Sequence, residues 1–475
     1  MKKGAKSAVC FIVAALMLLQ FAGCTDNSGD ISPDTSGSVP ENTEEILTSG
    51  VATEESSADE TTVAEISTGE ETTDIKSMKK EYSTLNYENV KAMWLSQFDL
   101  NSVYCTGGAQ RSESSYRTLI KNILGYVAEN GFNTVIVQVR PNADSMYPSD
   151  VYPASYYVVG SYGKNHTYDP FAILIEEAHA LELSVQAWIN PLRCMTSTQI
   201  TSVNKRYKIR EWYNDKSTNG TYIVLKGSNY YLNPAYEEVR KLIIDGAAEI
   251  LANYEIDGLH MDDYFYPTTD SSFDSAAYTE YKKSGGRLAL DAWRRNNLNL
   301  LVSGLYSTVK SAGEDIIFGI SPAGNINTVY NSQYADVYTW CSEPGYIDYI
   351  CPQVYFGLEH QTYDFKKVSE TFQSIIKTDS VKLIIGMTLG KAKSKTDQYA
   401  GTGKNEWAEH DDILKRCLEY TENLEKCTGV AYFCLQYFRN PVTGAEETAT
   451  AAERANFIPL LKEIKWNGAD PDTKQ

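Results

Sequence analysis

The feature that most constrains this fold is an eightfold alternation of short apolar segments with amphipathic ones, which begins near residue 90. The short segments have the length of strands, and the longer ones carry apolar residues at helical spacing. The predicted strands are 91–100, 133–141, 184–193, 257–267, 316–325, 346–356, 382–390 and 429–438. The predicted helices are 114–130, 170–181, 235–254, 288–312, 365–377, 411–424 and 450–464.

Strands with nearly continuous apolar runs are typical of a parallel sheet that helices cover on both faces. Eight of them, alternating with helices, predict a closed (β/α)8 TIM barrel in the α/β class. An open, doubly wound sheet is the alternative, but no GxGxxG motif follows the first predicted strand. The chain has 475 residues, which leaves room for one barrel and additional segments at its ends.

The first residues have the pattern of a bacterial export signal. Three lysines lie within the first six residues, and an apolar run follows at 8–22, too short to span a membrane comfortably. The run ends in Phe-Ala-Gly-Cys, which resembles a lipobox. We therefore predict a lipoprotein signal peptide at 1–23 and lipidation of Cys24, with an extracytoplasmic location on the bacterial membrane. The alternative is an ordinary secretory signal with an incidental cysteine.

The next segment, 24–82, is rich in Thr, Ser, Glu and Asp and is nearly free of aromatic residues. Such a segment buries too little apolar surface to offset the entropy lost on ordering, so we predict a disordered linker. The barrel domain is predicted at 83–466 and a C-terminal tail at 467–475. The net charge of −19 argues against nucleic acid as a partner, because the phosphate backbone would be repelled.

Amide, aromatic and basic residues gather at the C-terminal ends of the predicted strands, where the active sites of such barrels lie. Amides and arginine donate to sugar hydroxyls, and Trp and Tyr stack on sugar rings, although several of these residues could instead fill the core. The predicted substrate-binding residues are Gln97, Arg140, Asn142, Trp188, Asn190, Arg193, His260, Tyr264, Tyr266, Asn325, Gln353, Tyr355 and Tyr437.

The fourth predicted strand contains the segment DGLHMDDY, which carries two adjacent carboxylates. Because side chains alternate along a strand, His260, Asp262 and Tyr264 share one face. Leu259 and Met261 occupy the other face, toward the helices. The pattern therefore places Asp262 inside the barrel, near its C-terminal end.

Hydrolysis of a glycosidic bond usually requires two carboxyl groups. We predict that Asp262 is the nucleophile or stabilises the oxocarbenium ion. The candidates for the partner acid are Asp263, Glu359 and Glu343, in that order. As an alternative, the Asp262–Asp263 pair could cap the following loop or bind a cation.

No cofactor or metal ion is expected from the motifs of the chain. A glycine-rich loop for phosphate is absent, no HExxH occurs, and the five histidines are scattered. The chemistry is therefore expected to rest on side chains alone.

The barrel region resembles the glycosyl-hydrolase-like family 10 domain of bacterial envelope proteins. The segments that carry the resemblance are GFNTVIVQVRP, AWINPLR, LNPAYEEVR, DGLHMDDYFYP, ISPAGN and DYICPQVYF. They occur in order over nearly the whole barrel. The resemblance implies a TIM-like barrel with a glycosidase role, and one lipoprotein of the family hydrolyses peptidoglycan glycan strands that lack stem peptides.

The fourth strand is also similar to patterns of wider glycosidase groups. In the D-G-x-x-x-D pattern of the amylase superfamily the second Asp is the nucleophile, which corresponds to Asp262. The chitinase pattern D-G-x-D-x-D-x-E differs here, because His260 and Tyr264 stand where it has the middle Asp and the final Glu. The resemblance therefore does not supply a chitinase acid.

The leading hypothesis is a membrane-anchored glycoside hydrolase of a cell-envelope glycan, with peptidoglycan glycan strands as the favoured substrate. A hydrolase of another polysaccharide, such as an α-glucan, is the second hypothesis. A non-catalytic lipoprotein that binds glycans is the third.

The lipobox predicts that Cys24→Ser releases the protein from the membrane fraction, because the acylated thiol is lost. Fractionation of cells followed by immunoblotting measures this release. Cys10→Ser is the matched control, since Cys10 lies inside the predicted signal peptide and should not affect retention. Full membrane retention of the Cys24→Ser protein would contradict lipidation.

Overall fold

The computed structural model describes residues 82–262 and 265–466. The predicted signal peptide, Cys24, the linker up to residue 81 and the tail at 467–475 lie outside the described residues. Asp263 and Tyr264 lie outside them as well. No helix within the described part of the chain is long and apolar enough to cross a membrane.

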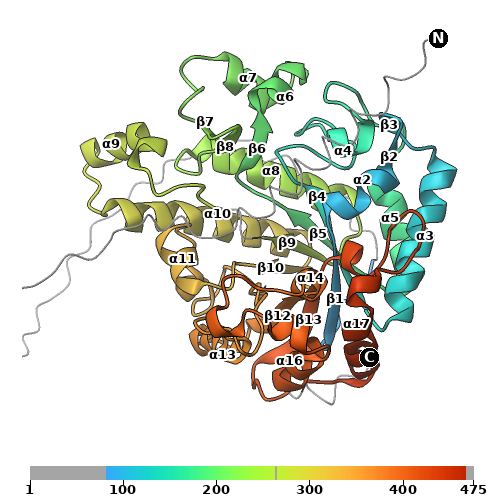
Figure 1. The fold of residues 1–475 in the computed structure, drawn as a ribbon. Helices are drawn as coiled ribbons and strands as arrows, with labels where there is room; N and C mark the ends of the chain where they lie inside the picture. The colour runs from blue at the N-terminus through green and yellow to red at the C-terminus, as the bar shows by residue number, and fades with distance from the viewer. Residues whose placement is uncertain (1–81, 263–264, 467–475) are drawn as a thin grey trace, which may run out of the picture. The chain divides into compact units, whose positions relative to one another are not determined.

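Eight parallel strands close into a barrel in which each strand lies beside its neighbours in the chain (Figure 1). All eight predicted strands are present, so the predicted (β/α)8 fold is confirmed. The strands are β1 (Val90–Leu95), β4 (Thr134–Arg140), β5 (Ser184–Ile189), β9 (Gly258–Met261), β10 (Ile317–Ile320), β11 (Tyr349–Ile350), β12 (Lys382–Thr388) and β13 (Cys427–Phe433).

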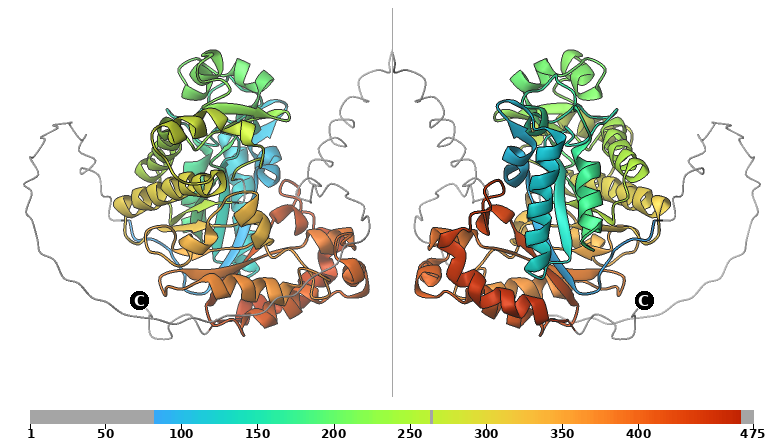
Figure 2. Two further views of the ribbon diagram at one scale, coloured as in Figure 1. Left: turned by 90° about the vertical axis from the view of Figure 1, so that its left-hand side faces the viewer. Right: turned by 90° about the vertical axis from the view of Figure 1, so that its right-hand side faces the viewer.

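Helices surround the strands on the outside of the barrel (Figure 2). Alternate strand residues such as Met93 and Leu95 pack against these helices, whereas Ala92 and Trp94 belong to a separate interior cluster. The long helices, at the predicted positions, are α3 (Glu113–Glu129), α5 (Pro170–His179), α8 (Glu237–Asn253), α10 (Leu290–Ala312), α13 (Phe365–Ile375), α16 (Ile413–Thr421) and α17 (Ala451–Glu463).

The first strand is shorter than predicted, because α2 (Gln97–Tyr104) begins directly after it. Ser96 and Asp99 form a capping box: Asp99 N donates to Ser96 Oγ at 3.3 Å, and Ser96 N donates to the Asp99 carboxylate at 2.7 Å. A Ser followed three residues later by an acidic residue signals a helix start. That signal is present in the sequence, but the apolar run predicts a longer strand over the same residues.

A small antiparallel sheet in the connection between β5 and β9 was not predicted. Its three strands have the order β6-β8-β7, and two short helices precede the β7–β8 hairpin. Two short helices between β10 and β11 were not predicted either. The elements concerned are β6 (Arg193–Thr196), α6 (Ser197–Ser202), α7 (Lys208–Asn214), β7 (Ile223–Lys226), β8 (Asn229–Leu232), α11 (Ile326–Asn331) and α12 (Val337–Trp340).

One buried carboxylate organises the N-terminal end of the barrel. Asp257, which is fully buried, accepts hydrogen bonds of 2.6 Å from the Tyr82 hydroxyl, Leu85 N and Val185 N. His179 Nε2 lies 3.0 Å from Asp257 Oδ2, the oxygen that also accepts from Val185 N. Asp257 therefore fastens the segment before β1 to the base of β5, and Tyr82, which we had assigned to the linker, packs at this base.

Replacement of this acceptor should destabilise the whole barrel. Asp257→Ala leaves two buried main-chain N–H groups without an acceptor, so we expect a loss of about 3 kcal/mol in the free energy of unfolding. Urea denaturation followed by circular dichroism measures it. Asp245→Ala is the control, because Asp245 forms an exposed ion pair with Lys241 worth less than about 1 kcal/mol. Equal stability of the two variants would contradict the role of Asp257.

Candidate active site

Asp262 lies directly after β9, at the C-terminal end of the barrel, and only 3% of its surface is exposed. Asn190 follows β5, the neighbouring strand, in which Ile189 is paired with Met261. This register sets Asn190 beside Asp262, and Asn190 Nδ2 donates a hydrogen bond to the Asp262 carboxylate. The predicted inward position of Asp262 is therefore accompanied by a buried amide donor from the next strand.

A chain of amides continues from Asn190 around the barrel. Gln138 Nε2 donates to Asn190 Oδ1 at 2.8 Å, and the main-chain N–H of Gln97 donates to Gln138 Oε1 at 2.8 Å. Each amide accepts from one side and donates to the other, which fixes the orientation of both. The ordered donors end on Asp262, so this amide relay positions the carboxylate.

His260 lies below Asp262, with no exposed surface. Trp94 Nε1 lies 3.4 Å from His260 Nε2, and His260 Nδ1 lies 2.7 Å from the Tyr349 hydroxyl, which donates to Gln186. Because the indole N–H only donates, we assign the proton of the imidazole to Nδ1. Burial lowers the pKa of His260 to about 3, so the ring is neutral.

The structure thus places His260, a predicted substrate contact, in the interior layer beneath the site, where its ring is fully buried. Gly319 of β10 makes this layer possible. A Cβ on Gly319 would lie 1.9 Å from the Tyr349 ring, which fills the space that the glycine leaves. The packed side chains of this layer fill the barrel interior beneath the site.

Aromatic rings form a continuous group inside the barrel. Trp188 lies edge-on to His260 at 6.5 Å, and Trp94 lies edge-on to both His260 and Phe433. Phe433 stacks with Tyr355 at 5.9 Å and lies 6.4 Å from Tyr437. Trp94 and Phe433 were missed, although both stand at alternating positions of predicted strands.

Three of these rings have features that suit a sugar. Tyr355 and Tyr437 are half-buried and lie beyond the strand ends, where a ring can offer one face. Trp188 is 6% exposed, and its Nε1 is a buried donor with no hydrogen-bond partner among the described residues. The structure thus brings Trp188, Tyr355 and Tyr437 to the interior and mouth of the barrel.

Two other predicted substrate-binding residues form hydrogen bonds that hold loops around the mouth. Asn325 caps α11 through its side-chain oxygen and donates to the Tyr363 hydroxyl at 2.8 Å. Gln353 donates to the main-chain oxygen of Ser321 at 3.2 Å. Both side chains are half-buried and therefore border the mouth while holding the loops after β10 and β11.

Asn142 and Arg193 lie in the loops that follow β4 and β5. The main-chain N–H of Asn142 donates to buried Asp144 at 2.8 Å, and Asn142 itself is half-buried. Arg193 begins β6, is half-buried, and lies close enough to Tyr156 and Tyr157 to lower the pKa of both hydroxyls against the larger effect of burial. These two residues belong to the wall of loops on the β4–β5 side.

The structure places Arg140, a predicted substrate contact, on the outer side of the strands. The pairing of β4 with β5 shifts between Gln138 and Arg140, and this irregularity interrupts the alternation of side chains. Arg140 is 1% exposed, and its guanidinium lies over the Tyr152 ring and donates to the Tyr152 hydroxyl at 2.9 Å. Gly246 of α8 leaves the space for both side chains, so Arg140 is part of the outer layer.

The structure also places Tyr266, a predicted substrate contact, away from the mouth. β9 ends at Met261, so strand alternation does not extend to this residue. The ring of Tyr266 is 2% exposed, packs edge-on against Tyr334 at 5.5 Å, and lies 5.4 Å from the guanidinium of Arg294 in α10. It fills the layer between the strands and the helices.

The candidates for the second carboxyl group differ in position. Glu343 is exposed and lies between α12 and β11, a helix-to-strand connection at the N-terminal end of the barrel, so it is excluded. Glu359 is exposed in the loop after β11, on the side of the site. Asp263 lies outside the described residues. Asp263 and Glu359 therefore stay as the candidates.

Three further carboxylates near the mouth hold the backbone of its loops. Asp99 accepts from Gln436 N at 2.7 Å, Asp144 accepts from Asn142 N at 2.8 Å, and Glu406 accepts from Leu358 N at 2.9 Å. All three are buried, and burial raises the pKa of each against the opposing effect of these hydrogen bonds. They are structural acids, and their loops are consequently well fixed.

The fold and the site together define a (β/α)8 barrel whose mouth combines a positioned carboxylate, an amide relay and aromatic rings. The family model of glycosyl hydrolase-like 10 matches residues 89–400, and the chain belongs to this family. The matched segment spans the strands from β1 to β12.

Two curated relatives support this assignment. The chain is 32% identical over 363 residues to the glycosyl hydrolase YngK of Bacillus subtilis (strain 168), which covers 72% of this chain and 68% of the relative. It is 29% identical over 387 residues to the glycosyl hydrolase DigH of Escherichia coli O6:H1 (strain CFT073), with 74% and 84% covered. The family assignment thus extends over most of each protein.

A solved structure with the same fold is the glycoside hydrolase domain of PgaB (BpsB) from Bordetella bronchiseptica. The TM-score is 0.50 at 12% identity, and the likeness covers 78% of this chain and 98% of that domain. At this identity the comparison supports the barrel fold alone.

The amide relay predicts a defined effect of Asn190→Ala. Loss of a charge-assisted hydrogen bond of about 1.5–3 kcal/mol should lower kcat/KM about 10- to 150-fold. The acid limb of the pH profile should move to higher pH, because an aspartate that loses a donor ionises less readily. Steady-state kinetics on a glycan that the parent cleaves measure both effects.

Gln138→Ala tests the same relay one step further from Asp262. We expect a smaller shift of the acid limb in the same direction. A variant that melts earlier but keeps the parental pH profile would assign a purely structural role to the relay.

Proposed function

We propose that this protein is an extracytoplasmic glycoside hydrolase, anchored to the membrane through Cys24, that cleaves peptidoglycan glycan strands. The observation that carries the hydrolase assignment is the Asp262–Asn190 pair at the C-terminal end of β9 and β5. A carboxylate held there by a buried amide can attack or stabilise a developing oxocarbenium ion.

Cleavage of a glycosidic bond at the barrel mouth requires different side chains for its different steps. Asp262 acts on the anomeric carbon as nucleophile or as electrostatic stabiliser. A second carboxyl group, Asp263 or Glu359, donates a proton to the leaving oxygen. Trp188, Tyr355 and Tyr437 provide the flat surfaces on which sugar rings stack.

The choice of substrate is supported by three features of the sequence and family. The lipobox-like end at Cys24 would keep the enzyme at the cell envelope. The acidic linker that follows would let the barrel reach material away from the membrane surface. The family resemblance includes a lipoprotein that hydrolyses peptidoglycan glycan strands without stem peptides.

The proposal predicts that Asp262→Asn abolishes most of the turnover and leaves the fold intact. Asn has nearly the same shape but carries no charge, so kcat should fall by about a thousandfold or more. The assay incubates purified protein with purified glycan strands and several polysaccharides and identifies the products by mass spectrometry. Thermal melting provides the control for folding.

The second acid is found by the same assay. Of Asp263→Asn and Glu359→Gln, the variant that removes the proton donor should lose activity on substrates with poor leaving groups, with a change in the basic limb of the pH profile. Parental turnover by Asp262→Asn would refute the mechanism. A parent that binds glycans but cleaves none would show a binding protein.

A further inference from the structure

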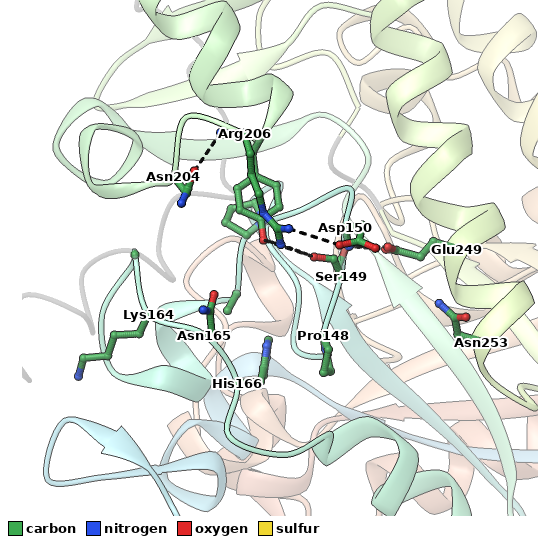
Figure 3. A pocket seen from close by; sticks show the side chains of 14 residues that line it. Pro148, Ser149, Asp150, Lys164, Asn165, His166, Asn204, Arg206, Glu249 and Asn253 are labelled. Carbon is green, nitrogen blue, oxygen red and sulfur yellow. Dashed lines mark hydrogen bonds and ion pairs between the residues drawn. The ribbon is translucent and has the colours of Figure 1, made fainter.

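A polar cavity of about 520 Å³ lies beside the end of α8, and its lining includes none of the residues described above at the mouth (Figure 3). Its walls come from the loop after β4, the connection after β5 and the last two turns of α8. We call it the flank pocket. It is lined by Pro148, Ser149, Asp150, Pro153, Ala154, Gly163, Lys164, Asn165, His166, Asn204, Arg206, Tyr207, Glu249 and Asn253.

Hydrogen bonds between its walls hold the flank pocket in shape. Glu249 of α8 accepts from Asp150 N at 2.7 Å and from the Ser149 hydroxyl. From the other side, the Tyr207 hydroxyl donates to Ser149 O at 3.3 Å, and Arg206 pairs with Asp150 at 3.5 Å. Three separate elements are thus tied together around the cavity, so a ligand would meet a preformed surface.

One wall carries a buried acceptor with no partner. Nε2 of His166 is buried and has no hydrogen-bond partner among the described residues. The ring also donates to the main-chain oxygen of Met146, and burial lowers the pKa of His166 to about 4. The imidazole is therefore neutral near pH 7, and its second nitrogen is left as an acceptor for an incoming O–H or N–H group.

The charges around the flank pocket balance. The lining contains two cations, Lys164 and Arg206, and two anions, Asp150 and Glu249, and Lys164 donates to Gly108 O at 2.9 Å. Figure 3 shows His166 and Asn165 beneath Arg206, with Glu249 and Asn253 on the other side of the view. Amides offer donors and acceptors together, which matches hydroxyl and acetamido groups better than an ion of either sign.

We propose that the flank pocket is a second glycan-binding site that holds a neutral sugar residue of the polymer whose cleavage occurs at the mouth. It rests on the proposed function for the class of ligand. His166 accepts from a sugar hydroxyl, and the amides of Asn165 and Asn253 bond further polar groups. A polymer bound at two places gains affinity from the second contact without a change in the chemistry.

Binding of insoluble poly-N-acetylglucosamine to the full-length protein tests this proposal. All proteins carry Asp262→Asn to prevent turnover, and the bound fraction is measured by sedimentation. Asn165→Ala and His166→Phe each remove hydrogen bonds from the flank pocket, so each should weaken the apparent Kd about two- to tenfold. Asn165 is exposed, so its substitution leaves the fold intact even if His166→Phe does not fold.

Asn423→Ala, an exposed asparagine in the connection before β13, is the matched control and should bind like the Asp262→Asn protein. Unchanged binding of Asn165→Ala, or no binding by any protein, would overturn the flank pocket as a glycan site. Weakened binding, when the parent cleaves no glycan, would support the pocket while refuting the proposed function. Parental cleavage with unchanged binding would refute the pocket alone.

Discussion

The contact between Asn190 and Asp262 depends on the pairing of two barrel strands, because 72 residues separate the two in sequence. Only the pairing of β5 with β9 brings their strand ends together. Inside the barrel, polar groups must find partners among themselves, since a buried donor or acceptor without one is costly. The interior amides and Asp262 therefore hydrogen-bond to one another in a fixed arrangement. The strand register determines which of these side chains are neighbours.

Periodicity alone predicted the barrel, because eight buried strands and their helices leave few other arrangements. It also predicted the inward position of Asp262, since alternation holds along β9. Alternation failed where regular pairing stops: Arg140 follows an irregularity in β4, and Tyr266 lies beyond the end of β9. Both are polar strand-end residues in sequence, and only tertiary packing distinguishes them from residues of the mouth.

The second acid could not be identified from sequence for a related physical reason. Acidic residues near strand ends have two uses in this fold. Asp99 and Glu406 accept main-chain N–H groups and fix loops, whereas Asp262 faces the place where a substrate would lie. Residue type and spacing are alike for both uses, and the difference lies in which donors surround each carboxylate.

The neutral imidazole of His260 limits where a proton for Asp262 can come from during a reaction. Its N–H points to Tyr349, whose hydroxyl points in turn to Gln186, so the protons of this layer are directed away from Asp262. With a pKa of about 3, His260 holds no spare proton under physiological conditions. His260 is therefore not a source of protons for Asp262, and a proton exchanged there during a reaction must come from another group or from solvent.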